Sequence, residues 1–445
     1  MAKVAVVGTG YVGSVTAVCL SWLGHDVIGY DMNPARAEQL AAGQLPIYEP
    51  GLDEKLAEAL ATGRLTFTSD PSVAAREADV IFLCVGTPTG LGGMPDMSQV
   101  ESAAHSVAPY LHAGAVVVNK STVPVGSGNW VRTMIEEAQP GRDAPAFHVV
   151  SNPEFLREGA ALEDFLYPDR IVLGGENGGE GTRIVAALYD RVLSQDFPGG
   201  RVDVKPGLVL TDLPSAEMVK YAANAFLATK ISFANEIANI CELVGADARQ
   251  VLPAIGADSR IGPKFLQHGI GWGGSCFGKD VAALIATGLD YGYGSQILRA
   301  TVEVNQAQRA AVIRKLQAEL KTLKGRRIAV LGLAFKPGTD DRRDAPALEI
   351  VRRLHTAGAV VAAYDPIVKE VPELADVPVR FASSAYDAGD RADAVVIATE
   401  WDEFAAIDLD KLAEHMKGTL LLDGRGVVSP VAAEAAGLRV RGFGW

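Results

Sequence analysis

One cysteine in a glycine-rich segment is the residue of this chain best suited to covalent chemistry. Cys276 lies within residues 271–280, which read GWGGSCFGKD, so that Lys279 and Asp280 close the segment. Glycines free the backbone to turn and let a ligand approach it closely. A thiol reacts as its thiolate, which a nearby cation or a helix N-terminus favours. We expect Cys276 to be a nucleophile, and the alternative is a buried, inert thiol.

The other cysteines lie in apolar runs. Cys19 and Cys241 follow helical patterns, and Cys84 lies in a strand-like run. Buried thiols of this kind behave as small apolar side chains. Four cysteines in 445 residues make no disulfide framework, and their spacing fits no zinc site. We therefore expect no metal site.

A glycine motif near the start of the chain predicts a dinucleotide site. Residues 8–13 read GTGYVG, directly after the strand-like run Val4–Val7 and before a helical pattern. Such glycines allow a tight turn, close approach of a pyrophosphate and close helix packing. The motif residues expected to contact the cofactor are Gly8, Gly10, Tyr11, Val12 and Gly13. A glycine-rich turn without a cofactor is the alternative.

Asp31 predicts which dinucleotide binds. It ends the second strand-like run, about 20 residues after the motif. A carboxylate at this place accepts hydrogen bonds from the ribose hydroxyls and repels a 2′-phosphate. Arg36 is the opposing signal, because a nearby arginine can hold that phosphate. We expect NAD, with Arg36 beside it.

Polar residues that follow predicted strands are expected to line one crevice, because ligands of an open α/β sheet bind outside the carboxyl ends of its strands. Thr87 and Thr122 follow two such runs, and Glu154 follows a third. Lys220 and Asn224 are four residues apart on a predicted helix and share one face. Each has an ordinary alternative: turn residues for the threonines, a loop acid for Glu154 and a surface lysine for Lys220.

The pattern of apolar runs predicts two Rossmann-like doubly wound α/β domains joined by helices. To about residue 205, β-branched runs alternate with helical stretches, as in a sheet of buried parallel strands. A long amphipathic helix follows, with Thr211 or Asp212 as its cap, Pro214 in its first turn and Gly245 as its stop. We predict a cofactor domain at 1–205, a helical dimerisation domain at 206–324 and a second Rossmann-like domain at 325–445.

Composition limits the classes of function. The length predicts two or three domains. The net charge of −13 argues against a nucleic-acid or anionic-membrane binder, because these need basic surface. No run approaches the roughly 18 apolar residues of a membrane span, and the start lacks the layout of a signal peptide. We expect a cytoplasmic protein that binds neither nucleic acid nor membrane.

Together, these motifs and their order resemble the UDP-glucose/GDP-mannose dehydrogenase family over essentially the whole length. The resemblance is carried by residues 8–13, 85–88, 121–126, 152–159, 220–224, 260–262, 273–280, 335–336 and 343–346. So many motifs in the right order are far more specific than any one of them. Two departures are small: Gly278 stands where relatives usually carry Pro or Gln, and Trp272 stands where Phe is usual.

The resemblance implies a four-electron oxidation of a nucleotide sugar at C6, with two NAD reduced and no metal. It implies that Cys276 holds the aldehyde as a thiohemiacetal and then as a thioester, which water hydrolyses. Glu154 is assigned acid/base work, and Lys220 stabilises oxyanions. Asp280, Asn224 and Thr122 accompany them, Thr122 near the reacting water. UDP-glucose, oxidised to UDP-glucuronate, is the expected substrate, and GDP-mannose or a UDP-N-acetylhexosamine is the alternative.

The resemblance also implies that the predicted domain at 325–445 binds the nucleotide sugar, and it implies further binding residues. Further expected NAD contacts are Thr87, Thr122, Glu158, Lys279 and Arg343. The expected substrate contacts are Glu154, Phe155, Leu156, Arg157, Lys220, Asn224, Arg260, Phe265, Leu266, Gly269, Gly273, Phe335, Lys336 and Arg425. In the family Arg260 comes from a partner subunit, which suits a homodimer or higher homo-oligomer built on the long helix. An NAD sensor without catalysis, or a two-electron hydroxyacid dehydrogenase, would have no use for Cys276.

Overall fold

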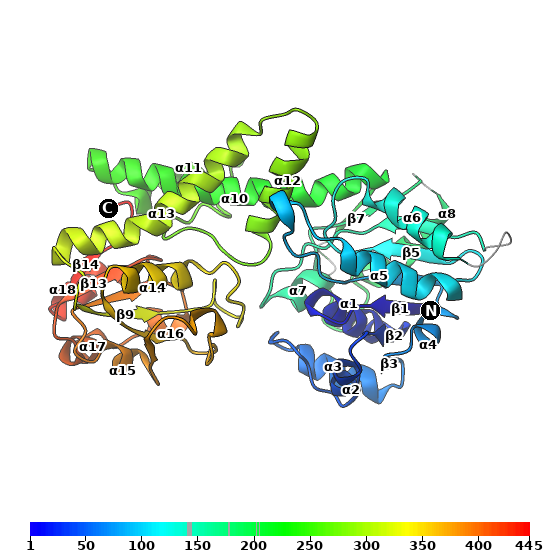
Figure 1. Cartoon of the computed structure of the whole chain (residues 1–445), viewed down its shortest axis with the longest axis horizontal. Coiled ribbons are helices and arrows are strands. Elements are labelled where there is room, and N and C mark those ends of the chain that lie inside the picture. The colour runs from blue at the N-terminus through cyan, green and yellow to red at the C-terminus, as the bar shows by residue number, and fades with distance from the viewer. Residues whose placement is uncertain (140–144, 177–178, 202, 204) are drawn as a thin grey trace. The chain divides into compact units, whose positions relative to one another are not determined.

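The structure is a computed structural model that describes residues 1–139, 145–176, 179–201, 203 and 205–445. The chain divides into two compact units, Met1–Ala223 and Asn224–Trp445 (Figure 1). The three predicted domain boundaries are a finer division than this one and stay a prediction.

The first unit is built on a sheet of strand order β3-β2-β1-β4-β5-β6-β7-β8. Its strands are β1 (Lys3–Val7), β2 (Asp26–Tyr30), β3 (Leu65–Thr68), β4 (Val80–Leu83), β5 (Val116–Asn119), β6 (His148–Ser151), β7 (Arg170–Gly174) and β8 (Gly207–Thr211). The order from β3 to β6 is that of dinucleotide-binding folds, which confirms the predicted fold class.

One neighbour in this sheet departs from the predicted parallel pattern, because β7 runs antiparallel to β6. A parallel neighbour needs a crossover, which is usually a helix. The connection between β6 and β7 carries only the short helix α7 (Ala161–Leu166). The strand-like pattern identifies β7 but contains no information on its direction.

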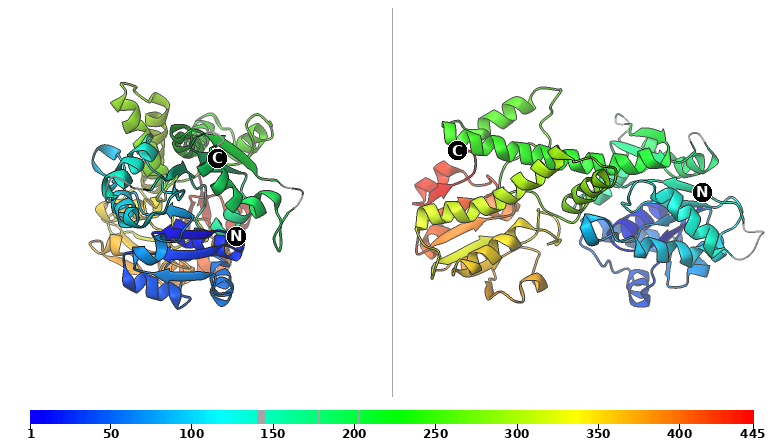
Figure 2. Two further views of the ribbon diagram at one scale, coloured as in Figure 1. Left: turned by 90° about the vertical axis from the view of Figure 1, so that its right-hand side faces the viewer. Right: turned by 45° about the horizontal axis from the view of Figure 1, so that its top comes forward.

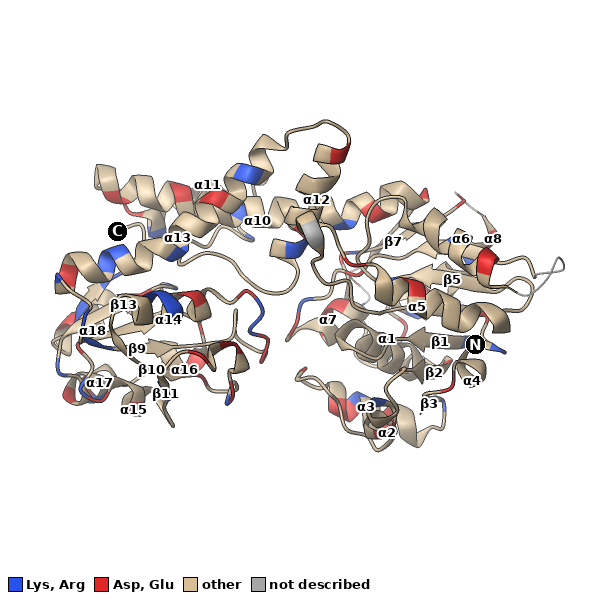
Figure 3. Ribbon diagram, viewed as in Figure 1, with Lys and Arg blue, Asp and Glu red and all other residues tan. Residues whose placement is uncertain are grey.

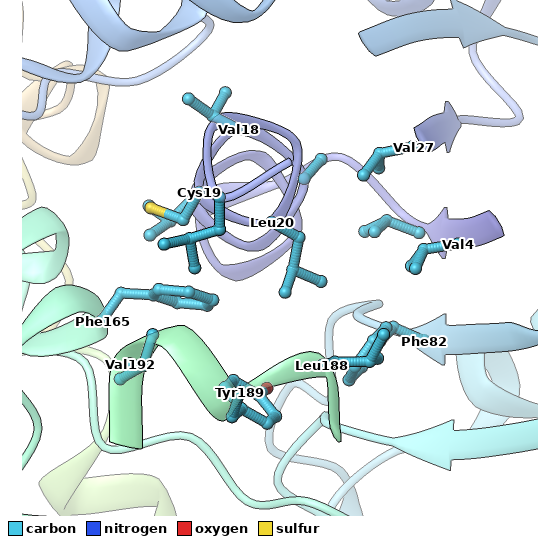
Figure 4. Packing of buried hydrophobic residues seen from close by; sticks show 14 of the residues in the cluster. Val4, Val18, Cys19, Leu20, Val27, Phe82, Phe165, Leu188, Tyr189 and Val192 are labelled. Atoms are coloured by element: carbon cyan, nitrogen blue, oxygen red, sulfur yellow. The ribbon is translucent and has the colours of Figure 1, made fainter. Parts of the chain in front are cut away.

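Helices cover both faces of the first sheet. One face is covered by α1 (Tyr11–Trp22), α3 (Leu52–Ala61), α7, α8 (Glu180–Leu188) and α9 (Asp190–Ser194), and the other by α4 (Pro71–Ala75), α5 (Ser98–Val107) and α6 (Ser127–Ala138). Side chains of a strand alternate between the two cores, so that Val116 and Val118 face one and Val117 faces the other. Figure 4 shows Cys19 of α1 in the first core, among residues that include Phe165 and Val192.

The predicted long helix is α10 (Leu213–Val244), which begins in the first unit and continues into the second. Asp212 is its cap, because its Oδ1 accepts a hydrogen bond from Ser215 N at 2.7 Å. Gly245 follows the last helical residue with φ of 76°, a conformation that suits glycine. Both predicted ends of the helix are confirmed.

The second unit contains further helices and a second sheet, of order β11-β10-β9-β12-β13-β14. Its strands are β9 (Arg327–Leu331), β10 (Val360–Tyr364), β11 (Val379–Phe381), β12 (Ala394–Ile397), β13 (Leu420–Asp423) and β14 (Arg439–Arg441), all paired in parallel. The order matches that of the first six strands of the first sheet and confirms a second Rossmann-like fold.

Helices also cover both faces of the second sheet (Figure 2). On one face lie α13 (Gln296–Leu320) and α14 (Pro346–Thr356), and on the other α15 (Ala385–Gly389), α17 (Leu409–His415) and α18 (Pro430–Ala435). The remaining helices are α2 (Pro34–Ala41), α11 (Ala248–Gly256), α12 (Phe277–Asp290) and α16 (Asp402–Ala405), with short 3₁₀ turns at Leu91–Gly93, Ala108–Tyr110 and Pro372–Leu374.

Charged residues of both signs are spread over the helices and loops, and basic residues lie among acidic ones (Figure 3). Among the described residues, none of the helices has both the length and the hydropathy that a membrane crossing requires.

Candidate active site

The glycine motif forms the turn between β1 and α1. Gly8 has φ of 87°, and a Cβ there would lie 2.7 Å from a side-chain carbon of Val85. A Cβ on Gly13 would lie 1.8 Å from the carbonyl oxygen of Gly8. At Gly10 no protein atom lies within 4 Å of such a Cβ. The turn is therefore open toward the N-terminus of α1, where a pyrophosphate binds, and it fits a dinucleotide.

Asp31 is buried directly after β2 and holds this turn. Its Oδ2 accepts hydrogen bonds from the backbone N (3.0 Å) and the hydroxyl (2.9 Å) of Thr9, and its Oδ1 accepts one from Asn33 N (3.0 Å). The guanidinium of Arg36 lies 3.9 Å from Oδ2. The Arg36 guanidinium therefore faces the Asp31 carboxylate. A carboxylate at this place suits the ribose hydroxyls of NAD better than a 2′-phosphate.

The loops after β4 and β5 lie side by side, as the sequence predicts. β4 and β5 are parallel neighbours. The hydroxyl of Thr87 donates to the carbonyl of Thr122 at 2.8 Å, and that of Ser121 donates to the carbonyl of Val85 at 2.7 Å. The two predicted threonines are therefore fixed to each other at one sheet edge.

Glu154 and Lys220 form a buried ion pair in the first unit. Lys220 Nζ lies 2.8 Å from Glu154 Oε1, and the other carboxylate oxygen accepts a hydrogen bond from Leu156 N at 2.6 Å. Burial raises the pKa of Glu154, but Lys220 and the Leu156 N–H outweigh it, so the pKa lies below its ordinary value. The alternatives of an exposed loop acid and a solvated surface lysine are wrong.

The segment that follows Glu154 is anchored in the same unit. The Phe155 ring lies 3.8 Å from the guanidinium of Arg170 and 5.6 Å from Lys220 Nζ. Arg157 instead turns toward α7, where it forms an ion pair with Asp164 at 2.6 Å. Leu156 packs against the first core, and Glu158 is half-buried.

Cys276 occupies the N-cap position of α12 in the second unit. It is partly exposed, whereas Cys19, Cys84 and Cys241 are buried. The hydroxyl of Ser275 lies 3.5 Å from its sulfur, and Asp280, one turn into the helix, donates its N–H to the Cys276 carbonyl at 2.8 Å. A helix N-terminus favours negative charge, so this position suits a thiolate.

Asp280 is fully buried and joins two other predicted residues. Its Oδ2 accepts a hydrogen bond from Asn224 Nδ2 at 2.6 Å, and its Oδ1 lies 2.8 Å from Lys279 Nζ. Lys279, expected at the cofactor, is therefore paired with Asp280 in this structure. Asn224 lies one turn after Lys220 on α10, as its i, i+4 spacing predicts.

The glycines before Cys276 have a packing reason that the sequence analysis did not foresee. A Cβ on Gly273 would lie 2.3 Å from the carbonyl oxygen of Asp344, and one on Gly274 would lie 2.7 Å from the ring of Phe335. A Cβ on Gly271 would lie 2.5 Å from Asn305 Oδ1. Protein atoms therefore occupy the positions that a Cβ would take, which gives these glycines a packing reason beside the predicted approach of a ligand.

Two of the expected substrate residues of the second unit, Gly269 and Arg425, lie at the carboxyl end of β13. Arg425 donates to the carbonyls of Ala398 (2.9 Å) and Gly271 (3.0 Å). A Cβ on Gly269 would lie 2.4 Å from the Gly424 carbonyl, so glycine is required there. Leu266 is buried, and Phe265, with φ of 64°, packs its ring 6.4 Å from that of Phe277. Lys336 Nζ lies 5.4 Å from the Phe335 ring.

Two expected arginines lie at the surface. Arg260 has 87% of its side chain exposed and pairs with Asp258 at 2.6 Å. Arg343 has 63% of its side chain exposed and pairs with Asp341 at 2.8 Å. The departure at Trp272 has a structural role, because its indole N–H donates to Ser232 Oγ at 3.0 Å and its side chain is buried.

Sequence reasoning missed a buried carboxylate that joins the cofactor turn to the segment after Glu154. Glu49 accepts hydrogen bonds from the Tyr11 hydroxyl and from the backbone N–H groups of Gly159 and Ala161, both at 2.7 Å. Glu49, Tyr11 and residues 159–161 lie far apart in the sequence. No spacing in the chain signals this contact.

Sequence reasoning also missed Glu217, a buried carboxylate on α10. It accepts hydrogen bonds from the backbone N–H groups of Gly126 (2.6 Å) and Gly128 (2.7 Å) at the N-terminus of α6. Burial raises its pKa to about 7, despite these two hydrogen bonds. The sequence feature that could have identified Glu217 is its position three residues before Lys220, because residues three apart lie on one helix face.

Comparison with known proteins places the chain in a family. The models of the UDP-glucose/GDP-mannose dehydrogenase family match in order: the NAD binding domain at residues 2–193, the central domain at 214–307 and the UDP binding domain at 329–430. The chain therefore belongs to the UDP-glucose/GDP-mannose dehydrogenase family. It is an NAD-dependent oxidoreductase, which confirms the resemblance and the cofactor inferred from the sequence.

Individual relatives match over the full length. The UDP-glucose 6-dehydrogenase of Rhizobium meliloti is 44% identical over 445 residues, covering 99% of each chain. The UDP-glucose 6-dehydrogenase TuaD of Bacillus subtilis is 44% identical over 98% of this chain and 92% of its own. Among solved structures, a UDP-glucose dehydrogenase of Pyrobaculum islandicum has a TM-score of 0.89 at 39% identity, covering 100% of this chain and 98% of that one. A UDP-D-ManNAc dehydrogenase of Pyrococcus horikoshii has a TM-score of 0.85 at 29% identity, covering 99% of each.

Proposed function

We propose that this chain oxidises UDP-glucose at C6 to UDP-glucuronate. One turnover consumes one water and two NAD⁺ and releases two NADH. The observation that carries the reaction type is the partly exposed Cys276 at the start of α12. The buried Asp280 lies one turn further along α12 and accepts a hydrogen bond from Asn224 of α10. The choice of UDP-glucose rests on relatives of that name at 44% identity.

The cysteine explains how the oxidation continues past the aldehyde. The sulfur adds to the aldehyde carbon, and the resulting thiohemiacetal retains a C–H that can leave as hydride. Loss of that hydride gives a thioester on Cys276, which water hydrolyses to the carboxylate and the free thiol. Bound NAD supplies the hydride acceptor in both oxidations, held at the glycine turn by α1 and at its ribose by Asp31.

The two polar clusters have separate tasks in this proposal. Lys220 moves from Glu154 to the substrate oxygen and stabilises the oxyanion, since a cation near that oxygen favours the charged form. Glu154, which is ionised beside Lys220, is the acid/base for hydrolysis, and Thr122 lies near the reacting water. Asp280 and Asn224 accompany Cys276 and orient the water or the sugar hydroxyl.

The substrate contacts are proposed from the family motifs. Lys336 and Arg425, with residues 265–273, bind the nucleotide sugar, and Glu158, Lys279 and Arg343 contact NAD. Arg260 is exposed in this chain, which suits its proposed use in the site of a second subunit. We propose a homodimer through α10, where Phe226, Phe233 and Ile240 are exposed at intervals of seven residues.

The test is NADH stoichiometry across nucleotide sugars. UDP-glucose is expected to give two NADH and a uronic acid per molecule consumed. GDP-mannose and UDP-N-acetylhexosamines serve as comparison substrates, because the family model and the Pyrococcus horikoshii structure include such enzymes. One NADH with an aldehyde product would contradict the four-electron mechanism. Faster acid formation from another nucleotide sugar would contradict only the substrate.

A further inference from the structure

A buried lysine at the end of β5 has no task in the reaction as proposed above. Lys120 directly follows Asn119, the last residue of β5, and is 5% exposed. Lysines are seldom buried without a carboxylate partner, because removing an ammonium group from water is costly. In the described part of the chain, no Asp or Glu lies within ion-pairing distance of Lys120. The burial of Lys120 therefore needs an explanation other than an ion pair.

Burial lowers the pKa of Lys120, whereas the hydrogen-bond acceptors and aromatic rings around its Nζ favour the charged form. Its Nζ donates hydrogen bonds to Asn152 Oδ1 at 3.1 Å and to the Tyr189 hydroxyl at 3.4 Å. It also lies 5.9 Å from the ring centres of both Phe82 and Tyr189, a distance at which ring faces attract an ammonium. Both rings belong to the first core (Figure 4). The side chain is therefore held in place by these contacts.

Asn152 connects this lysine to the segment that carries Glu154. Its Nδ2 donates to the carbonyl of Val172 at 3.0 Å, and its Oδ1 also accepts from the Tyr189 hydroxyl at 2.7 Å. Its backbone N–H donates to the carbonyl of Asn119 at 2.9 Å. Every one of these bonds fixes the chain two residues before Glu154. Lys120 is thus fixed to the point from which the Glu154 segment leaves the sheet.

Two lysines and one backbone N–H group act on the Glu154 carboxylate. Lys220 contacts it directly, the Leu156 N–H donates to it, and Lys120 acts on it through space. Burial by itself raises the pKa of Glu154, and these groups lower it. The charged and titratable groups that act on Lys120 are Glu154, Lys220 and the Cys84 thiol.

We propose that Lys120 is a positioning residue for Glu154: its fixed ammonium keeps that carboxylate ionised while Lys220 turns from Glu154 to the substrate oxygen. This inference rests on the proposed function, in which Lys220 has to leave Glu154. Without Lys120, a buried carboxylate that loses its ion-pair partner takes up a proton. The ionised form is the one that accepts a proton from the hydrolytic water.

The experiment compares pH profiles of uronic acid formation in the full-length protein. Lys120→Met keeps the length of the side chain and removes the charge. We expect the acid limb of its profile to move to a higher pH by about one unit. At pH values below the acid limbs of both the wild type and the variant, the variant is then roughly tenfold slower. The thermal unfolding midpoint is expected to stay near that of the wild type, because Asn152 Oδ1 keeps the Tyr189 hydroxyl.

Two further variants keep the test decisive. Lys120→Gln also lacks the charge but can still donate to Asn152, so it is expected to show the same shift even if the Met variant does not fold. Tyr189→Phe retains the cation and is expected to leave the acid limb in place. Superimposable profiles for wild type and both Lys120 variants would overturn the proposal, as would an equal loss at every pH with a lowered midpoint. Absence of uronic acid from the wild type would refute the proposed function instead.

Discussion

Cys276 differs from the other cysteines in its surroundings. Burial raises the pKa of the Cys84 thiol to about 12. Cys19 and Cys241 are also buried. Cys276 is partly exposed at the first turn of a helix, where negative charge is favoured. The apolar periodicity around the other three predicted their burial, because such periodicity reports which side chains face a core.

The first prediction follows from this contrast. Cys276→Ala removes the sulfur that forms the thioester, so uronic acid formation is expected to fall below detection. Cys276→Ser is expected to slow the reaction or trap it at the ester that replaces the thioester, because an oxygen ester is hydrolysed less readily. Quantifying UDP-glucuronate and NADH in the same samples measures both. Cys241→Ala is the matched control and should form acid at close to the wild-type rate, whereas wild-type turnover in the Cys276→Ala variant would refute the role of the thiol.

Asp31 shows that a residue type alone does not define a cofactor site. Asp365 occupies the equivalent place after β10, and its Oδ2 accepts hydrogen bonds from the N–H groups of Leu333 (2.7 Å) and Ala334 (3.1 Å). Both aspartates thus hold the turn after the first strand of their sheet. The difference lies in Gly10, beside which the turn is open, so the glycine carries the cofactor signal more specifically than the carboxylate does.

At the scale of elements, α10 links several functional groups through simple helical spacing. Glu217, Lys220 and Asn224 lie three and four residues apart along one face. Glu217 fixes the N-terminus of α6, which directly follows the loop of Thr122. The helix therefore positions the Thr122 loop with one side chain and contributes Lys220 one turn further on.

Glu217 gives stability a pH dependence. Its pKa is raised from 4.5 to about 7 in the folded protein. The unfolded chain therefore releases this proton first as pH rises, and the free energy of unfolding falls between about pH 4.5 and 7, by roughly 3 kcal/mol. Glu217→Gln removes the ionisation, so urea unfolding from pH 5 to 8 is expected to show a difference between wild type and variant that changes with pH. A constant difference across that range would contradict the assignment.

The elements that escaped the sequence analysis are strands with weak patterns. β11 and β14 have three residues each, which is too short for a clear alternation. Leu65 is the one buried residue of β3. β8 lies at the sheet edge with Leu208, Val209 and Leu210 all exposed, so it has no buried face to mark it. The more fully buried strands and α10 were predictable because burial imposes their patterns.

For the whole molecule, the exposed apolar residues of α10 predict self-association. Phe226, Phe233 and Ile240 are 66%, 48% and 46% exposed, and their spacing of seven places them on one face of the helix. Phe233→Asp puts a charge in the middle of this face, so we expect the dimer to dissociate at least tenfold more readily in sedimentation experiments. Val431→Asp on α18 introduces the same charge at another exposed apolar residue and should leave the mass unchanged. A monomeric wild type, or a Phe233→Asp variant that stays dimeric, would argue against the α10 interface.

The sequence by itself determined the local parts of this protein. The glycine turn, the ends of α10, the buried strands and the candidate groups Cys276, Glu154 and Lys220 follow from residue types at short spacing. Such features depend on backbone conformation and on periodic burial, which neighbouring residues encode. The family resemblance added the roles of these groups but not their contacts.

Tertiary structure decided which distant residues meet. Glu49 joins three separated segments, and Lys120 reaches Asn152 and Tyr189 only because β5, β6 and the α8–α9 region pack together. It also gave the glycines before Cys276 their reason, which is the close approach of Asp344 and Phe335. Hydrogen bonds and charges between distant segments depend on packing, and no spacing along the chain reports it. The sequence therefore predicted the candidate reacting groups. The fold decided which distant residues form hydrogen bonds with them or place a charge near them.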